Sequence, residues 1–289
     1  MNTQQELYEC HGHLMMDGED YLTARRRHLG GVDMSAVRSY LTALQNAGVR
    51  YFRDGGDALG VSEAARGIAP DWGIEYATPV FAIHREGRYG GIVGRGYRDL
   101  AEYRVRIAEA KAAGCDFIKL MFSGIITFRA FGELSCPGLD AGEIRALVEI
   151  AHGEGFRVMA HVNGADSVLA AVDAGTDSIE HGYFMDGACL RALADSESIW
   201  VPTIAAIAAF VGRPGFDPEV TAQVFAHQQD CIRRAAEMGV KIACGSDSGA
   251  VGVPHGSGAA TEHALLCNAG VSPEAIADAS ELLRRRFRV

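Results

Sequence analysis

The sequence has no apolar run long enough to cross a lipid bilayer. Its longest apolar stretch, residues 199–211, contains Pro202 and is shorter than the roughly 20 residues that a membrane helix needs. The first ten residues, MNTQQELYEC, contain neither the basic nor the apolar segment of a secretory signal. We therefore expect a cytoplasmic protein that does not bind membranes.

Paired cysteines are also missing. The chain has seven cysteines, an odd number, and no CxxC motif. This pattern is typical of reduced thiols and argues against a disulfide framework. It agrees with a reducing compartment.

Positive charge is scarce. Lysine and arginine number 27 against 37 aspartates and glutamates, which gives a formal net charge of −10. A surface of this sign repels nucleic acid and anionic lipid. The two dense basic runs, residues 25–27 and 284–286, fall in helix-like stretches, where we expect a solvated face. The charge therefore favours a small-molecule partner over nucleic acid.

The sequence does contain a repeated unit of helix, glycine and strand. At five places a helix-like stretch ends in glycine and is followed at once by a short run rich in β-branched or aromatic residues; these glycines are Gly48, Gly114, Gly155, Gly175 and Gly239. Glycine at this position adopts the left-handed conformation that ends a helix. The short runs are typical of strands buried on both faces, so the repeat indicates a parallel α/β protein.

Eight segments fit such strands: residues 7–10, 49–53, 74–81, 117–120, 157–160, 178–180, 199–202 and 240–244. Helical periodicity fills the gaps between them, for example in residues 100–112, 141–152, 165–174 and 219–237. Eight alternating units favour a closed (β/α)8 TIM barrel that forms a single domain over residues 1–289. An open doubly wound sheet is the alternative.

A glycine-rich segment, residues 87–96, follows the expected third strand. It is a candidate mobile lid, and an ordinary flexible loop is the alternative. Its glycines do not form a dinucleotide-binding fingerprint, because no compact turn into a helix follows them.

Histidine and aspartate residues lie at the expected carboxyl ends of several strands, where a barrel places its active site. His11 and His13 follow the first strand and project to the same side because side chains alternate along a strand. His161, His181 and Asp247 end the fifth, sixth and eighth strands. A hydrogen-bonded polar residue would explain any one of them, but all five on one rim predict a metal site.

Lys119 ends the expected fourth strand in the apolar context DFIKLMFSG. Burial of an ammonium group is costly and favours the neutral amine. A neutral amine can react with carbon dioxide to form a carbamate, whose two oxygens could bridge two cations. The alternative is an ion pair with a nearby carboxylate such as Asp54.

This set of residues resembles the amidohydrolase superfamily. The order is HxH, a lysine on strand four, histidines on strands five and six, and an aspartate on strand eight. The surrounding segments IKLMFSG, HVNGADSVLAAVDAGTDSIEHG, GSDSGAVGVPHG and NAGVSPEAI resemble the branch that contains imidazolonepropionase and the dizinc Xaa-Pro dipeptidases. The resemblance covers roughly residues 11–280.

The resemblance implies a zinc site with one or two ions per chain. One metal would be held by His11, His13 and Asp247. The second would be held by His161 and His181, with carbamylated Lys119 bridging the two in a binuclear centre. Members of the branch that keep a single metal use fewer of these residues.

The chain departs from the family pattern at its ends. Members of this branch usually carry a small β-sandwich around the barrel, whereas here ten residues precede His11 and the chain ends at Val289. We expect the barrel surface left without this sandwich to be apolar and covered by a second subunit in a homo-oligomer. The helix over residues 273–287, apolar at Ile276, Leu283 and Phe287, is the expected contact.

The expected reaction is metal-dependent hydrolysis of an amide bond in a dipeptide, an N-acyl amino acid or a cyclic amide. A water between the cations would lose its proton and attack the carbonyl carbon, and Asp247 would carry the proton to the leaving nitrogen as the catalytic acid and base. The expected substrate contacts lie in loops after the strands and are His84, Arg88, Tyr89, Tyr183 and His255. Arg85 or Arg88 would pair with a substrate carboxylate through two hydrogen bonds.

Three other interpretations use the same residues. A lactonase or a decarboxylase could use the same metal rim, although the decarboxylases of related families lack a lysine like Lys119. A non-catalytic binding protein with a vestigial site is the third. Retention of all six ligand-type residues argues against it, since no structural role requires them together.

Overall fold

Residues 6–288 are described by the computed structural model of the chain. The strands are β1 (Leu7–Gly12), β2 (Val49–Asp54), β3 (Glu75–Ala77), β4 (Ala82–Arg85), β5 (Gly94–Tyr97), β6 (Ile118–Met121), β7 (Val158–Val162), β8 (Ser178–His181) and β9 (Ile199–Val201). The α-helices are α1 (Tyr21–Arg27), α2 (Met34–Asn46), α3 (Val61–Ile68), α4 (Leu100–Ala112), α5 (Ala141–Gly153), α6 (Ala165–Asp173), α7 (Gly187–Ala194), α8 (Ile204–Ala208), α9 (Pro218–Glu237), α10 (Ser257–Asn268) and α11 (Pro273–Arg286), with one 3-10 turn at Ala69–Trp72.

All strand pairs in the two sheets are parallel, which confirms the prediction of a parallel α/β protein. One sheet has the order β1-β2-β3 and the other the order β5-β4-β6-β7-β8-β9. The five glycines predicted to end helices all have positive φ: Gly48, Gly114, Gly155, Gly175 and Gly239. The local signal was therefore read correctly at each of them.

The expected third strand is divided into β3 and β4, which belong to different sheets. β3 pairs with β2, whereas β4 pairs with β6. Between them Pro79 has no N–H to donate, and Val80 has a φ of 68°, which no extended strand contains. The glycine-rich segment also differs from a plain loop, because its end forms β5 against β4.

The expected eighth strand is present only as isolated bridges. Ile242 pairs with Trp200 and Ser248 pairs with Gly12, both in the parallel sense. Backbone hydrogen bonds of 2.9 Å run from Trp200 N to the Lys241 carbonyl and from Cys10 N to the Cys244 carbonyl. Segment 241–248 therefore connects the free edge of β9 with the free edge of β1.

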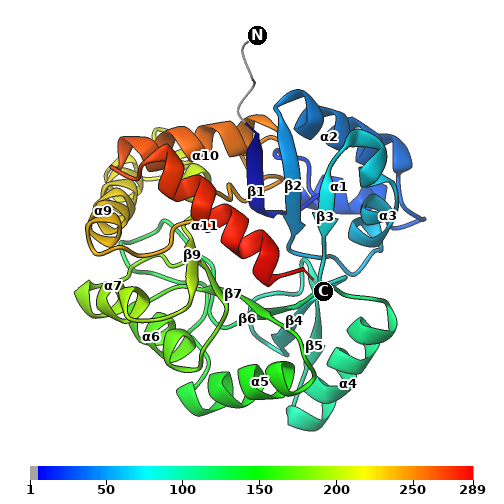
Figure 1. The fold of residues 1–289 in the computed structure, drawn as a ribbon, viewed down its shortest axis with the longest axis horizontal. Coiled ribbons are helices and arrows are strands. Elements are labelled where there is room, and N and C mark those ends of the chain that lie inside the picture. Colours follow the sequence, from blue (N-terminus) through cyan, green and yellow to red (C-terminus); the bar gives the residue numbers. More distant parts are fainter. Residues whose placement is uncertain (1–5, 289) are drawn as a thin grey trace.

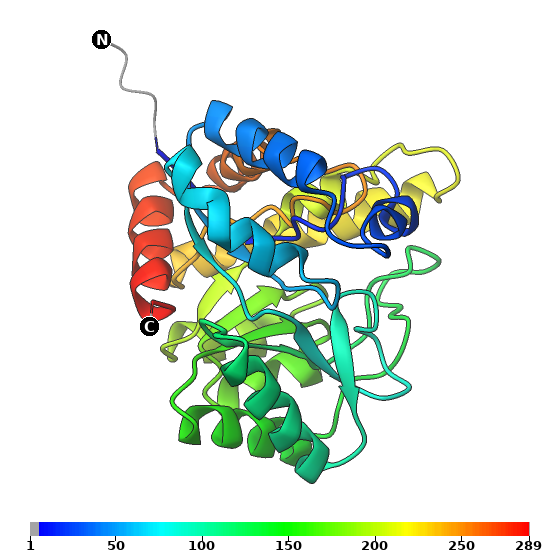
Figure 2. The same cartoon turned by 90° about the vertical axis from the view of Figure 1, so that its right-hand side faces the viewer.

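The helices surround the strands, and α11 crosses one end of them (Figure 1). Seen from the side, α11 lies at one end of the molecule and long loops project at the opposite end (Figure 2). The end under α11 is closed by packing: the Phe287 ring lies 5.3 Å from the Phe117 ring and 4.5 Å from the Arg53 guanidinium. The pocket described below therefore opens at the other end.

The predicted contact between subunits at α11 is wrong. Ile276, Leu283 and Phe287 are all at most 2% exposed within this chain. The helix presents its apolar side to the interior of its own chain, and Arg284 forms ion pairs with Glu281 and Glu75. The apolar stripe serves the fold and is not available to a partner.

The cysteines form no disulfide bonds among the residues that the structure describes, in agreement with the prediction of reduced thiols. All seven cysteines are free. None of the helices that the structure describes has the length and apolar character needed to cross a bilayer.

Candidate metal centre

Six predicted ligands line one pocket at the carboxyl ends of the strands. They are His11, His13, Lys119, His161, His181 and Asp247, and the pocket has a volume of about 290 Å³. The strand register places them there, since His11 lies in β1, Lys119 in β6, His161 in β7 and His181 in β8. The sequence thus predicted which residues meet.

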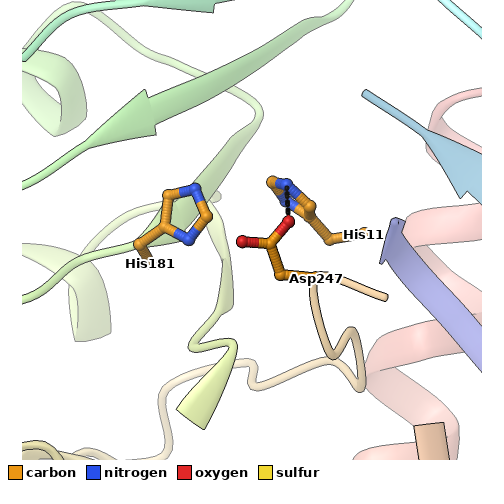
Figure 3. Close-up of side chains that lie close together, drawn as sticks. All are labelled: His11, His181 and Asp247. Atoms are coloured by element: carbon orange, nitrogen blue, oxygen red, sulfur yellow. Dashed lines mark ion pairs between the residues drawn. The ribbon is translucent and has the colours of Figure 1, made fainter. Parts of the chain in front are cut away.

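Three of the six form the tightest group. One ligand atom from each of His11, His181 and Asp247 lies within 4.8 Å of the other two, and the three side chains point toward a common space (Figure 3). Asp247 Oδ1 is 3.5 Å from His11 Nε2 and 3.4 Å from His13 Nε2. The His161 and His181 rings are 4.6 Å apart, so both predicted halves of the site are adjacent.

Hydrogen bonds fix which ring nitrogen can bind a metal. His11 Nδ1 is 2.6 Å from Glu180 Oε2, and His161 Nε2 is 3.2 Å from the Gly124 carbonyl. A carboxylate and a carbonyl only accept, so these nitrogens carry the proton and donate. The lone pairs then lie on His11 Nε2 and His161 Nδ1, as metal ligation requires.

A buried ion pair between Arg53 and Glu180 holds the carboxylate that contacts His11. Arg53 Nη2 donates to Glu180 Oε1 at 2.8 Å, and Arg53 Nη1 donates to Ser178 Oγ at 2.9 Å. All three side chains are fully buried. Sequence reasoning missed this pair, although opposite charges inside the buried strands YFRD and SIEH were a usable signal.

The backbone is unusual at the same place. His181, Thr203 and Asp247 have φ values of 68°, 49° and 63°. Such left-handed conformations cost on the order of 1 kcal/mol or more for residues other than glycine and gather at functional sites. Thr203 also bonds His181, because its Oγ1 lies 2.8 Å from His181 Nδ1.

Burial keeps the four histidines in the neutral state that binds a metal. It lowers the pKa of His13 and of His161 to about 3, and those of His11 and His181 well below the usual value. It raises the pKa of Asp247 to about 6 and lowers that of Lys119 to about 8. At neutral pH the imidazoles are therefore neutral and most of Asp247 is ionised.

These residues fit a divalent metal ion. His11 Nε2, Asp247 Oδ1 and Lys119 Nζ are buried without a hydrogen-bond partner among residues 6–288. Two lone-pair atoms that face each other at 3.5 Å with no proton between them repel, and a cation removes that repulsion. Nitrogen and oxygen donors are the ligands that zinc takes.

Lys119 is not paired with Asp54, which was the alternative to a free amine. Asp54 accepts hydrogen bonds from Leu14 N at 3.0 Å, from Gly56 N at 2.6 Å and from the Tyr76 hydroxyl. Its oxygens are therefore engaged elsewhere. The amine of Lys119 remains open to the pocket, as carbamylation would need.

One glycine next to the site has a steric role. A Cβ atom built on Gly55 would lie 2.1 Å from His13 Cε1. Any side chain at this position would displace the imidazole. Gly55, directly after β2, is therefore needed to leave room for the His13 ring.

The expected substrate contacts are divided. Tyr89 and Tyr183 line the pocket, with the Tyr89 ring 4.9 Å from the His161 ring. His84, Arg88 and His255 are not among the residues that line it. His255 Nε2 lies 2.8 Å from the Met16 carbonyl, and Arg88 Nη1 donates to the Pro137 carbonyl at 3.5 Å. Substrate contact by these five residues stays a prediction.

The rest of the lining is mainly apolar and was not anticipated. It includes Ile126 and Phe128 from the loop after β6, and Ile207, Phe210 and Phe216 from α8 and the segment after it. Large apolar side chains in loops were the available signal, but sequence alone did not show that the two segments meet.

The sequence matches a family model and known proteins. A family model described as the amidohydrolase family matches residues 10–286. An ochratoxinase of Aspergillus niger is 26% identical over 276 residues, which cover 84% of this chain and 57% of that protein. An uncharacterized protein of Mycobacterium tuberculosis is 29% identical over 164 residues, 55% of this chain and 43% of that protein. The chain thus spans about half the length of the curated relatives it matches.

A solved structure of a Xaa-Pro dipeptidase with bound methionine has a similar fold. Its TM-score is 0.77 at 24% identity, and the match covers 97% of this chain and 75% of that chain. At this identity the likeness concerns the fold.

Proposed function

This chain belongs to the amidohydrolase family, and from that premise we propose that it hydrolyses an amide bond of a small molecule with a bound divalent metal ion. The observation that carries the proposal is the meeting of His11, His181 and Asp247 within 4.8 Å, with buried lone-pair atoms that lack a partner among the described residues. A purely structural cluster would pair these atoms with each other or with neighbouring donors.

The proposal includes a closed (β/α)8 barrel as the support of the site. The hydrogen bonds from segment 241–248 to β9 and β1 support it, as does the direct passage of the chain from β3 to β4. A closed ring would hold ligands from four different strands at fixed spacing.

In this proposal zinc is the metal, with one or two ions per chain. His11, His13 and Asp247 would hold one ion. His161 and His181 would hold the other, and Lys119 would bridge them as its carbamate. A bound divalent cation would polarise the amide carbonyl and lower the pKa of water toward neutrality.

Asp247 has the properties of the proton carrier. Its carboxylate lines the pocket beside the histidines, and a carboxylate in this position can both accept and return a proton. One of its oxygens would take the proton from the attacking water and release it to the leaving nitrogen. The apolar walls around it would exclude bulk water and strengthen these interactions.

The test combines metal analysis with a substrate screen. We expect the purified protein to contain zinc and to hydrolyse at least one member of a panel of dipeptides, N-acyl amino acids, cyclic amides and neutral amides. Asp247→Asn should lose turnover by a factor of roughly 100 or more. Hydrolysis of lactones alone, or metal binding without any turnover, would contradict the proposal.

The fold does not test two further expectations, the location and the assembly of the protein. Cytoplasmic location and homo-oligomeric assembly stay predictions. A small-molecule substrate agrees with a pocket of about 290 Å³, which lies near the lower end of the range for ligand sites.

A further inference from the structure

The outer wall of the pocket is an aromatic cluster made by two separate segments. Phe128 stacks on Phe210 with ring centroids 4.7 Å apart and an interplanar angle of 28°. The Phe216 ring meets both, at 5.9 Å from Phe128 and 4.8 Å from Phe210. We call Phe128, Phe210 and Phe216 the aromatic wall; all three line the pocket.

The backbone holds this wall in place. Phe128 has a φ of 55°, a conformation that a bulky residue adopts only under constraint. Ile126 and Ile207 are buried next to it in the same hydrophobic cluster. The ring of Phe128 is therefore fixed by its surroundings before any ligand binds.

The pocket has little positive charge along its lining. No arginine is among the residues of the described chain that line it, and its one lysine is Lys119 in β6. Arg85 is 2.5 Å from Glu143 in an ion pair, and Arg213 lies 5.7 Å from the centre of the Phe210 ring without lining the pocket. A substrate carboxylate seated between the apolar side chains of the wall would lose its hydration without an arginine to pair with, which is costly.

We propose that the substrate is an amide with an uncharged alkyl or aryl substituent seated against the aromatic wall, and that this substituent carries no carboxylate. This rests on the proposed amide hydrolysis and narrows it. It also replaces our expectation of a dipeptide or N-acyl amino acid held by an arginine, because the arginines named for that role do not line the pocket.

Turnover of a matched substrate series tests the proposal. The series is the p-nitroanilides of acetic, butanoic and hexanoic acid, with succinyl and adipoyl counterparts that add a terminal carboxylate at equal chain length. We expect kcat/KM to rise about fourfold for each methylene group added, from the transfer free energy of that group. The carboxylated counterparts should react roughly 100-fold more slowly.

Two variants locate the effect on the wall. Phe128→Ala should lower kcat/KM for the hexanoyl substrate roughly tenfold and leave the acetyl substrate within about twofold. Phe131→Ala is the matched control, because Phe131 lies three positions further along the same loop, is 41% exposed and does not line the pocket. Phe216→Ala repeats the test if Phe128→Ala does not fold.

A binding measurement separates this proposal from the proposed reaction. Calorimetry with chelator-treated protein compares hexanamide, acetamide and the monoamide of adipic acid. If hexanamide binds more tightly than acetamide and Phe128→Ala removes the difference, the aromatic wall binds the alkyl substituent as proposed, even if no anilide is cleaved. Absence of cleavage would then contradict the proposed amide hydrolysis and leave the inference about the wall standing. Equal or tighter binding of the carboxylated amide, weakened by Arg213→Ala, would overturn the inference.

Discussion

Replacement of Lys119 by methionine should stabilise the metal-free protein at neutral pH. The side chain is 1% exposed, its amine has no hydrogen-bond partner among residues 6–288, and burial lowers its pKa from 10.5 to about 8. At neutral pH the amine is nevertheless protonated, so the folded state contains a buried charge. Methionine fills a similar volume without a charge.

The size of the effect follows from the pKa. A drop from 10.5 to about 8 corresponds to a penalty of about 3 kcal/mol, since each pH unit is worth about 1.4 kcal/mol. Between these two values the unfolded chain holds a proton that the folded chain does not, so the stability of the wild type rises with pH in this window. Below pH 8 the full penalty acts, and above pH 10.5 it has gone.

Denaturant unfolding across this pH range measures the effect, in chelator-treated and bicarbonate-free protein. Lys119→Met should be about 3 kcal/mol more stable than the wild type at neutral pH, and the two curves should converge at high pH. Lys111→Met is the control, because Lys111 is exposed and its pair with Glu154 at 3.0 Å contributes about 1 kcal/mol at most. A variant that is less stable than the wild type at neutral pH would refute the reasoning.

Three further predictions concern the metal. His13→Ala should lower bound metal and turnover together, and elemental analysis that finds wild-type metal content alongside full activity would show the assignment to be wrong. Glu180→Gln should weaken metal binding roughly 10- to 100-fold, because glutamine offers one accepting oxygen where His11 and Arg53 now use two; competition with a chromogenic chelator measures this, and unchanged affinity would contradict it. Bicarbonate should convert Lys119 to its carbamate and raise the metal content toward two ions per chain, whereas an unmodified lysine in a crystal structure with one bound ion would favour a mononuclear site.

Much of the site was predictable because its signals are local. His11, His161 and His181 each end a short apolar run, and parallel strands bring their carboxyl ends to one rim. The glycines that end helices are equally local, since the left-handed conformation is set by the residue itself. Agreement between these signals predicted the parallel α/β class and the residues that line one pocket.

Other features depend on contacts that are distant in the sequence. Arg53 and Glu180 are 127 positions apart and meet only after β2 and β8 have taken their places. The aromatic wall likewise forms only on folding, because Phe128 and Phe210 belong to different loops that are distant in the sequence. In the segment around Ile242 the sequence predicted more structure than is present. Its apolar pattern suggests a full strand, but only single bridges form.

The left-handed conformations of His181, Thr203 and Asp247 were not predicted, because residues other than glycine adopt this conformation only uncommonly. Distant hydrogen bonds explain why they keep it. Trp200 Nε1 and Gln228 Nε2 both donate to the His181 carbonyl at 3.0 Å, and Asp247 N donates to the His11 carbonyl at 2.8 Å. Each of these bonds would be left unmade in a buried place if the backbone relaxed, which costs as much as the strain it would relieve. The orientation of two predicted ligands is thus set by contacts across the whole folded chain, and sequence patterns can name such residues without predicting how they point.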